Sequence, residues 1–294
     1  MILPAPFVLF DLDGTLIRPG SGLQRRHMAA MQWAIRETSG SAEEFRYEGG
    51  DLFYAYVNLS GFTDAGTIEA ALTIAGTPRA ALPAARERAV TLMRHRLGTE
   101  PHPHSADDAL PGAVHAVRAL AAAGVRVGLS TGNARSIALW KVERLGLADV
   151  LTTGGFGDVA RDRDLVVAQG LAAFGGNPTG GVVVGDTAKD ISAAHNSGLR
   201  CVAVATGGST EEQLARAGAD KVLRTLDHPH ATTVITEVAR GPAVCLWGKP
   251  LADGLTGADR VSRQSLLAVS PGRPSPAESV SSGAYSVARG SGPA

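Results

Sequence analysis

The chain has 294 residues, 44% of them hydrophobic, which is enough for one large domain or for a core with a smaller second domain. Basic and acidic residues number 28 each, so the net charge is zero and favours neither nucleic acid nor an anionic membrane as a partner. No apolar run reaches the ~20 residues of a membrane span, and two cysteines indicate neither a disulfide framework nor a structural zinc site. We expect a cytoplasmic protein.

The first predicted element is a buried strand at residues 7–10, FVLF, which runs directly into Asp11 and Asp13. Two carboxylates so close together raise each other's pKa and cost stability unless a cation or a donor compensates them. A lone pair of this kind is often a turn or a helix cap. Here Gly14 and Thr15 follow the pair at the end of an apolar run, which indicates a functional site.

Residues 22–98 come next and show helical periodicity rich in alanine, arginine and leucine, with almost no strand signal. We expect helices over 23–38, 64–75 and 80–97. Thr63 or Asp64 is the expected N-cap of the second helix, and Gly76 its C-terminal stop. An all-helical block after the first strand predicts a second, smaller domain, hinged near residues 18–22 and 99–111.

From residue 112 onward, apolar runs alternate with helical segments. The expected strands are 125–130, 181–185 and 201–205, and the expected helices are 112–123, 134–145, 164–174 and 188–197. This alternation predicts an α/β fold, with a Rossmann-like parallel sheet covered by helices on both faces. We assign residues 1–21 and 99–240 to this core and residues 22–98 to the helical domain. The Ser-, Gly- and Pro-rich end of the chain makes 241–294 a predicted disordered tail.

In an open parallel sheet, ligands bind beyond the carboxyl ends of the strands, so the polar residues that follow the strands should meet there. These residues are Asp11, Asp13, Ser130, Thr131, Gly132, Asn133, Asp186, Thr187 and Asp190. Arg161 and Arg163 lead into a helix between the last two groups. The sequence therefore predicts a crevice that combines acids, hydroxyl groups and a basic residue.

Such a set of side chains suits the transfer of a phosphoryl group. Asp11 and Asp186 can share Mg²⁺, which prefers oxygen ligands and removes the repulsion between the acids. Asp11 would attack phosphorus and form an aspartyl phosphate. Asp13, kept protonated by its charged neighbour, would protonate the leaving oxygen and later accept a proton from water.

The remaining residues of the crevice can bind the phosphate group. Thr131 and the amides that open the helix at 132–134 can hold its oxygens. Arg163 can balance the charge of the transition state, and Gly14 lets the backbone turn closely beneath the phosphate.

Three motifs resemble those of the haloacid dehalogenase-like phosphatases: FDLDGTL at 10–16, LSTGN at 129–133 and VVVGDTAKD at 182–190. Arg163 fits the basic motif of this family best, and Arg161 is second. The helical block is similar to the family's cap, and GFTD at 61–64 resembles a cap segment of phosphoglycolate phosphatase-like members. The resemblance covers residues 5–238. It implies the catalytic residues Asp11, Asp13, Thr131 and Arg163, phosphate binding by Gly132 and Asn133, and the metal ligands Asp11, Asp13, Asp186 and Asp190.

We therefore expect a Mg²⁺-dependent phosphatase that hydrolyses a small phosphorylated metabolite, with phosphoglycolate as a candidate substrate. Asp13 suits a phosphate ester rather than a carbon–halogen bond. A sugar phosphomutase would share every motif and stays an alternative.

Two other classes explain the sequence less well. GLSTG at 128–132 matches the nucleophile elbow of a serine esterase, with Ser130, Asp186 and His228 in the order of a triad. That interpretation leaves Asp11 and Asp13 unexplained. A binding protein on an inactive phosphatase scaffold should lack a catalytic acid, and all of them are present.

Overall fold

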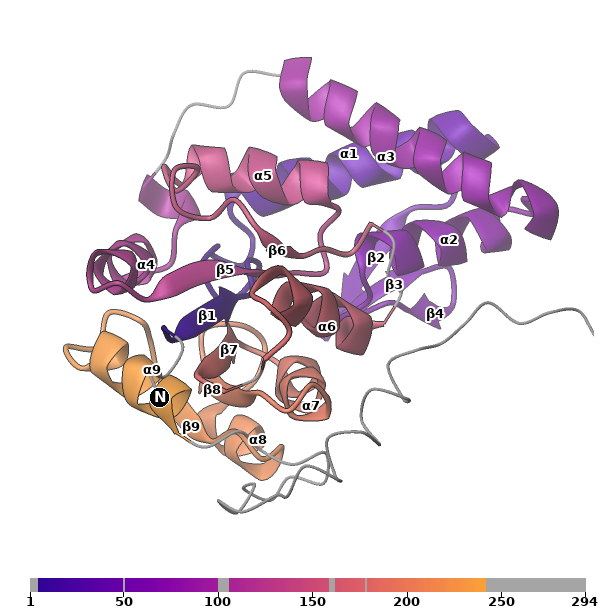
Figure 1. The fold of residues 1–294 in the computed structure, drawn as a ribbon. Coiled ribbons are helices and arrows are strands. Elements are labelled where there is room, and N and C mark those ends of the chain that lie inside the picture. The colour runs from indigo at the N-terminus through magenta and orange to yellow at the C-terminus, as the bar shows by residue number, and fades with distance from the viewer. Residues whose placement is uncertain (1–4, 50, 100–105, 159–161, 178, 242–294) are drawn as a thin grey trace, which may run out of the picture. The chain divides into compact units, whose positions relative to one another are not determined.

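The structure, a computed structural model, describes residues 5–49, 51–99, 106–158, 162–177 and 179–241. A six-stranded sheet forms the centre of the fold (Figure 1). Its strands are β1 (Phe7–Phe10), β5 (Arg126–Ser130), β6 (Gly154–Gly155), β7 (Gly181–Gly185), β8 (Arg200–Val204) and β9 (Lys221–Leu223). They lie in the order β6-β5-β1-β7-β8-β9, and every neighbouring pair is parallel. The predicted parallel sheet is confirmed.

The register of the central strands determines which loops meet. Phe10 of β1 lies opposite Leu129 of β5 and Val184 of β7. The residues that follow these three strands therefore stand at one level along the carboxyl edge of the sheet. Because β1 lies between β5 and β7, Asp11 occupies the middle of that edge.

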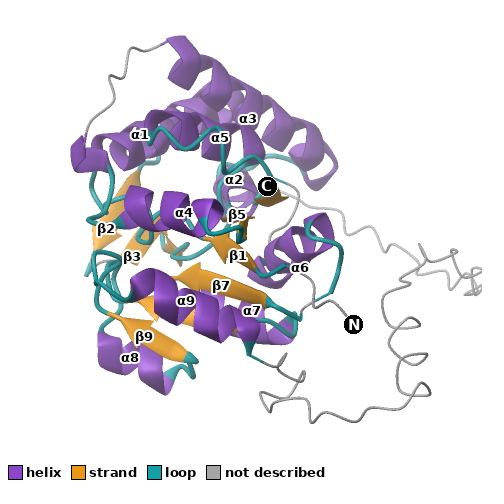
Figure 2. Ribbon diagram, turned by 60° about the vertical axis from the view of Figure 1, so that its left-hand side comes forward, coloured by secondary structure: helices purple, strands orange, loops and turns teal. Residues whose placement is uncertain are grey.

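Helices cover both faces of the sheet (Figure 2). On one face, α4 (Ala113–Ala122) and α9 (Ala231–Arg240) pack with the side chains of Val8 and Phe10. On the other face, α6 (Arg163–Ala173) and α7 (Ala188–Asn196) pack with those of Phe7 and Leu9. Successive residues of a strand point to opposite faces, so a strand that is apolar throughout needs both layers. Helices α5 (Arg135–Arg144) and α8 (Glu211–Arg216) complete the module.

The segment 22–98, called the inserted segment below, contains the three expected helices. They are α1 (Gly22–Ser39), α2 (Asp64–Ile74) and α3 (Leu82–Thr99), and a short 3₁₀ turn at Arg79–Ala81 precedes α3. Thr63 is the N-cap of α2, since its hydroxyl accepts a hydrogen bond from the Gly66 amide at 3.1 Å. Gly76 follows the helix with a φ of 84°, a conformation that glycine adopts without strain.

The expectation of an all-helical inserted segment is wrong at residues 45–58. Three antiparallel strands form a second sheet there: β2 (Phe45–Glu48), β3 (Asp51–Tyr54) and β4 (Val57–Asn58). The rings of Phe45 and Tyr54 pack together across β2 and β3, with centroids 5.0 Å apart, and Tyr54 is buried. Aromatic residues were the available signal, but strands of four, four and two residues are too short for an alternating pattern to be recognised.

Two strands of the main sheet, β6 and β9, were also not predicted from the sequence. β6 has two residues and β9 has three, which is too short for an alternating pattern to be recognised. Both lie at the outer edges of the sheet, where they extend it without changing the position of Asp11.

The two junctions of the inserted segment lie side by side. The Arg18 amide donates to the Asp108 carbonyl, and the Leu110 amide donates to the Leu16 carbonyl, both at 2.9 Å. A 3₁₀ turn at Ala106–Asp108 closes the second junction. The domain boundaries at residues 21/22 and 98/99 stay predictions. Residues 100–105 of the expected hinge and 242–294 of the expected tail lie outside the described residues.

Among the helices that the structure describes, none has both the length and the apolar character needed to cross a bilayer.

Candidate active site

Three carboxylates meet at the carboxyl edge of the sheet. Asp11 follows β1, Asp186 follows β7, and Asp190 lies in the first turn of α7. Each offers one oxygen atom, and these atoms all lie within 4.8 Å of one another. All three side chains are buried. A group of buried carboxylate oxygens is a ligand set that suits Mg²⁺, and without positive charge it is unfavourable.

The acidity of this group reflects its burial. Burial raises the pKa of Asp11 to about 7, against the opposing charge of Arg163, and the charges of Asp190 and Asp13 add to the increase. Burial also raises the pKa of Asp186 well above its usual range, and Asp11 and Asp190 contribute to that increase. Both carboxyl groups therefore favour a proton or a cation as compensation.

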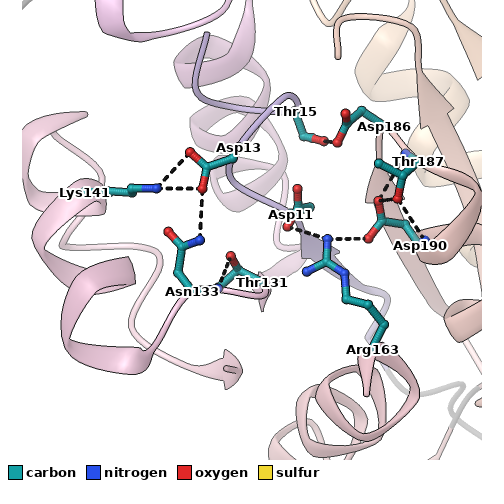
Figure 3. A network of polar contacts seen from close by, with 10 residues as sticks. All are labelled: Asp11, Asp13, Thr15, Thr131, Asn133, Lys141, Arg163, Asp186, Thr187 and Asp190. Carbon is teal, nitrogen blue, oxygen red and sulfur yellow. Dashed lines mark hydrogen bonds and ion pairs between the residues drawn. The ribbon is translucent and has the colours of Figure 1, made fainter. Parts of the chain in front are cut away.

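Arg163 supplies part of the compensating charge from the first position of α6 (Figure 3). Its Nη2 atom lies 3.0 Å from Oδ1 of Asp11 and 2.8 Å from Oδ1 of Asp190. Burial alone would lower the pKa of Arg163, but Asp190 and Asp11 raise it above its usual value. The guanidinium group thus stays charged beside the expected nucleophile. Arg161, the second candidate for this role, lies outside the described residues.

Asp190 is bound through both of its oxygens. Oδ1 contacts Arg163, whereas Oδ2 accepts hydrogen bonds from the Thr187 amide at 3.1 Å and the Thr187 hydroxyl at 2.6 Å. The contact with the Thr187 amide, together with a hydrogen bond from the Asp190 amide to the Thr187 hydroxyl at 3.3 Å, forms the capping box that begins α7. Asp186 accepts a hydrogen bond from the Thr15 hydroxyl at 3.3 Å. Asp190 therefore positions Arg163 and α7, in addition to belonging to the three-carboxylate group.

Asp13 points away from this group and toward α5 (Figure 3). Lys141 Nζ lies 2.8 Å from Oδ1 and 2.6 Å from Oδ2 of Asp13, and Asn133 Nδ2 donates to Oδ2 at 2.9 Å. Burial would raise the pKa of Asp13, but Lys141, the nearby His27 and the two hydrogen-bond donors together lower it.

The expectation that Asp13 is kept protonated by its neighbour is therefore wrong for this arrangement. A buried ammonium group, rather than the charge of Asp11, dominates its environment. The structure does not bring the Asp13 carboxylate into the three-carboxylate group, and its role as a metal ligand stays a prediction.

The turn Thr131–Ala134 connects β5 to α5 beside these acids. The Thr131 hydroxyl accepts a hydrogen bond from the Asn133 amide at 3.2 Å, and the Ala134 amide donates to Oδ2 of Asp64 at 2.8 Å. Two of the amides expected to bind phosphate are thus engaged within the protein. A Cβ on Gly132 would lie 3.2 Å from Arg163 Nη1, so the turn passes directly beside the guanidinium group.

Two glycines leave room for the Asp186 carboxylate. A Cβ on Gly14 would lie 2.4 Å from Asp186 Oδ2, and one on Gly207 would lie 1.7 Å from the same atom. Gly14 also has a φ of 93°, which disfavours other residues. The sequence predicted that Gly14 lets the backbone turn closely beneath the phosphate, which is a different reason for a glycine there, and it gave no indication for Gly207.

The serine esterase alternative is wrong, because its triad is not assembled. The Ser130 hydroxyl is buried and has no hydrogen-bond partner among the described residues. His228 is exposed after β9, and its Nδ1 accepts a hydrogen bond from the His230 amide. No base in the described part of the chain is therefore in contact with Ser130.

Sequence analysis missed Lys141, and the signal was weak. Lys141 lies in the run IALWKV, and a lysine on the apolar side of a helix is rarely fully buried without a partner. The run indicates a buried charge but does not identify its partner, because Asp13 is 128 residues away along the chain.

A model of the haloacid dehalogenase-like hydrolase family matches residues 7–198. The chain belongs to this family. The family expected from the three motifs is thus confirmed, and the protein is a hydrolase. The match begins at β1 and includes the inserted segment and the end of α7.

Two curated relatives of this hydrolase are phosphoglycolate phosphatases. The one from Agrobacterium fabrum is 26% identical over 224 residues, which cover 74% of this chain and 88% of the relative. The one from Caulobacter vibrioides is 26% identical over 241 residues, which cover 80% and 94%. Among solved structures, a β-phosphoglucomutase from Clostridium difficile matches with a TM-score of 0.54 at 15% identity, covering 80% of this chain and 97% of that one. This last similarity shows a shared fold.

Proposed function

We propose that this haloacid dehalogenase-like hydrolase is a Mg²⁺-dependent phosphatase that acts on a small phosphorylated metabolite through a phosphoaspartate on Asp11. The observation that carries the proposal is the meeting of Asp11, Asp186 and Asp190 within 4.8 Å, with Arg163 in contact with Asp11. The names of the two curated relatives support phosphoglycolate, or a metabolite like it, as the substrate.

The acidic group fits a divalent cation chemically. Asp11 and Asp186 would hold Mg²⁺ through carboxylate oxygens, with Asp190 within reach, and the raised pKa values of Asp11 and Asp186 reflect their need for positive charge. When bound, the ion would neutralise the acids and polarise the phosphate.

Residues of the chain supply the nucleophile, the positive charge that stabilises the transition state, and the groups that orient the phosphate. Asp11 attacks phosphorus, and Arg163, in contact with Asp11, binds the oxygens of the transferred group as their charge increases. Thr131, Gly132 and Asn133 border the same space and orient the phosphate.

Asp13 moves the protons in this scheme. Its ionised form, which Lys141 favours, can accept a proton from the water that hydrolyses the phosphoaspartate. Donation of a proton to the leaving group needs the neutral form, so Asp13 must take up a proton before that step while Asn133 and Lys141 hold its carboxyl group in place.

The inserted segment is the expected cap that selects the substrate and excludes water. The turn before α2 lies against the phosphate-binding turn, since the Asp64 amide donates to the Gly132 carbonyl at 2.7 Å. Lys189 of α7 donates to the Ser60 carbonyl at 2.7 Å, which adds a second contact between the cap and the sheet module. The expected location of the enzyme is the cytoplasm.

The test is the release of inorganic phosphate from a panel of phosphorylated metabolites, including phosphoglycolate and sugar phosphates. Release should require Mg²⁺ and stop in EDTA. Asp11→Asn should lower kcat by several orders of magnitude, whereas Ser130→Ala should keep most of it. Beryllium fluoride should inhibit only when Mg²⁺ is present. Isomerisation of a sugar phosphate without net release would identify the phosphomutase alternative, and metal-independent turnover by Asp11→Asn would refute the proposal.

A further inference from the structure

Helix α5 begins without a capping side chain of its own. Its N-cap residue, Ala134, has the extended backbone of a helix cap (φ −56°, ψ 143°) but no side-chain acceptor. In a capping box, the side chain at the third helical position accepts a hydrogen bond from the N-cap amide. Asp190 does so for Thr187 at the start of α7. The matching position of α5 is Ile137, which is buried and apolar.

Asp64 of the inserted segment supplies the acceptor for the N-cap amide of α5. Its Oδ2 atom accepts a hydrogen bond from the Ala134 amide at 2.8 Å, and its own amide donates to the Gly132 carbonyl at 2.7 Å. One residue thus binds both sides of the turn that leads into α5. The Asp64 side chain is buried, and His27 Nε2 of α1 lies 3.2 Å from the same Oδ2 atom. A carboxylate at a helix N-terminus is also favoured by the helix dipole.

The turn and helix that Asp64 holds carry the groups that hold Asp13. Asn133 lies within the turn, and Lys141 lies two turns along α5. Both donate to the Asp13 carboxylate, at 2.9 Å and at 2.6–2.8 Å respectively (Figure 3). A continuous series of contacts therefore runs from the inserted segment through Asp64 and α5 to Asp13.

Asp64 has a local role as well, because it begins α2 next to its N-cap Thr63. That role does not need the contacts with Ala134 and Gly132, since Thr63 supplies the capping hydroxyl. The contacts with the turn are extra to those that form α2, and they join two parts of the chain that are 70 residues apart.

We propose that Asp64 is a positioning residue for proton transfer: by capping α5 from the inserted segment, it fixes Asn133 and Lys141 against Asp13. The inference rests on the proposed function for its catalytic consequence and on geometry alone for the capping. Asp64 touches no reacting atom in this scheme. It makes the arrangement around Asp13 depend on the inserted segment lying against the turn.

The first measurement is hydrogen exchange of the amides in residues 131–138, with Asp64→Ala, Asp64→Asn and Glu69→Gln compared with the unchanged protein. Asp64→Ala should increase exchange at Ala134 at least tenfold, because its amide loses the acceptor. Asp64→Asn keeps an amide oxygen there and should show a smaller increase. Glu69 of α2 pairs with Arg86 of α3 at 3.2 Å within the inserted segment, so Glu69→Gln is the matched control and should leave residues 131–138 unchanged.

The second measurement separates positioning from a loss of stability. A p-nitrophenolate group leaves without protonation, whereas the alkoxide of an alkyl phosphate needs a proton from Asp13. Asp64→Ala should therefore lower kcat for an alkyl phosphate at least tenfold more than kcat for p-nitrophenyl phosphate, and Asp64→Asn should have a smaller effect in the same direction. Glu69→Gln should lower both equally or not at all.

The outcomes are distinguishable. Unchanged exchange at Ala134 in folded Asp64→Ala, or in folded Asp64→Asn if the alanine variant does not fold, overturns the capping whatever the activity is. Equal losses of kcat on the two substrates overturn the positioning role. If the unchanged protein hydrolyses no phosphate ester, the proposed function fails, and the exchange result still decides whether Asp64 caps α5.

Discussion

Replacing Lys141 by methionine tests how much the buried ion pair between Lys141 and Asp13 contributes to the free energy of unfolding. Methionine keeps most of the length of the lysine side chain but removes the ammonium group, which lies 2.6 Å from Oδ2 of Asp13. The Lys141 side chain is fully buried, and the Asp13 side chain is 23% exposed. Among the described residues, the variant therefore leaves the Asp13 carboxylate in a largely buried site with the hydrogen bond from Asn133 and the nearby His27, but without its ammonium partner.

The magnitude follows from the burial of the partner that remains. Removing one member of a buried ion pair typically costs about 3–5 kcal/mol, because the other charge is left uncompensated. Water reaches part of Asp13, so we place Lys141→Met below that range, at about 2–3 kcal/mol of unfolding free energy. Asp13→Asn leaves an ammonium group that water does not reach, and it should cost the full amount of about 3–5 kcal/mol.

The assay is a double-mutant cycle by urea unfolding at pH 7, followed by circular dichroism. The double variant Lys141→Met/Asp13→Asn buries no unpaired charge, so it should lose less than the sum of the single variants. We expect a coupling energy of at least about 1.5 kcal/mol. Arg216→Met removes the exposed pair with Glu212 on α8 and serves as the control, with an expected change of about 0.5 kcal/mol or less. A coupling energy below about 0.5 kcal/mol between Lys141 and Asp13 would refute this reasoning.

Three further predictions concern the acidic group itself. Burial raises the pKa of Asp11 from 3.8 to about 7. In EDTA, between these two pH values, the folded protein therefore holds a proton that the unfolded chain has released, and the free energy of unfolding should fall as the pH rises from about 4 to about 7. Urea midpoints between pH 4 and 8 should show a smaller slope for Asp11→Asn, and an unchanged slope would contradict the shift. Gly207→Ala places a Cβ 1.7 Å from Asp186 Oδ2 and should raise the Mg²⁺ concentration for half-maximal activity at least tenfold. A Cβ on Gly208 meets nothing within 4 Å, so Gly208→Ala is the control and should leave this concentration unchanged. Equal Mg²⁺ requirements of the two variants would show that Asp186 is not a ligand. Arg163→Met should lower kcat by about 10²–10³-fold with a smaller change in KM, and Arg163→Lys should recover part of the loss; a change confined to KM would assign Arg163 to substrate binding alone.

The sequence was sufficient to predict the location of the candidate site. Asp11, Thr131 and Asp186 each follow an apolar run that reads as a strand, and the carboxyl ends of parallel strands share one edge of a sheet. Local pattern and a general rule of topology are enough for this prediction, since neither depends on side-chain packing. The helices of the inserted segment were predicted for the same reason, because their periodicity is local.

The small sheet at residues 45–58 was not predicted, because its strands are stabilised by their pairing. β2, β3 and β4 have four, four and two residues, and only their antiparallel contacts and the packing of Phe45 on Tyr54 distinguish them from loops. Such pairing energy is absent from a single short segment read alone.

The state of Asp13 was decided by the tertiary structure. Asp11 lies two residues from Asp13 in the sequence, which predicts a protonated Asp13. In the fold, however, the chain after β1 directs the Asp13 carboxylate toward Lys141 of α5, which is 128 residues away along the chain. Asp64 and Ala134, 70 residues apart, meet in the same way. The sequence determined which residue types stand at the strand ends, because that depends on local pattern. Only the folded chain decides which charges those residues face, because Coulomb energy depends on distance and burial in space rather than on separation along the chain.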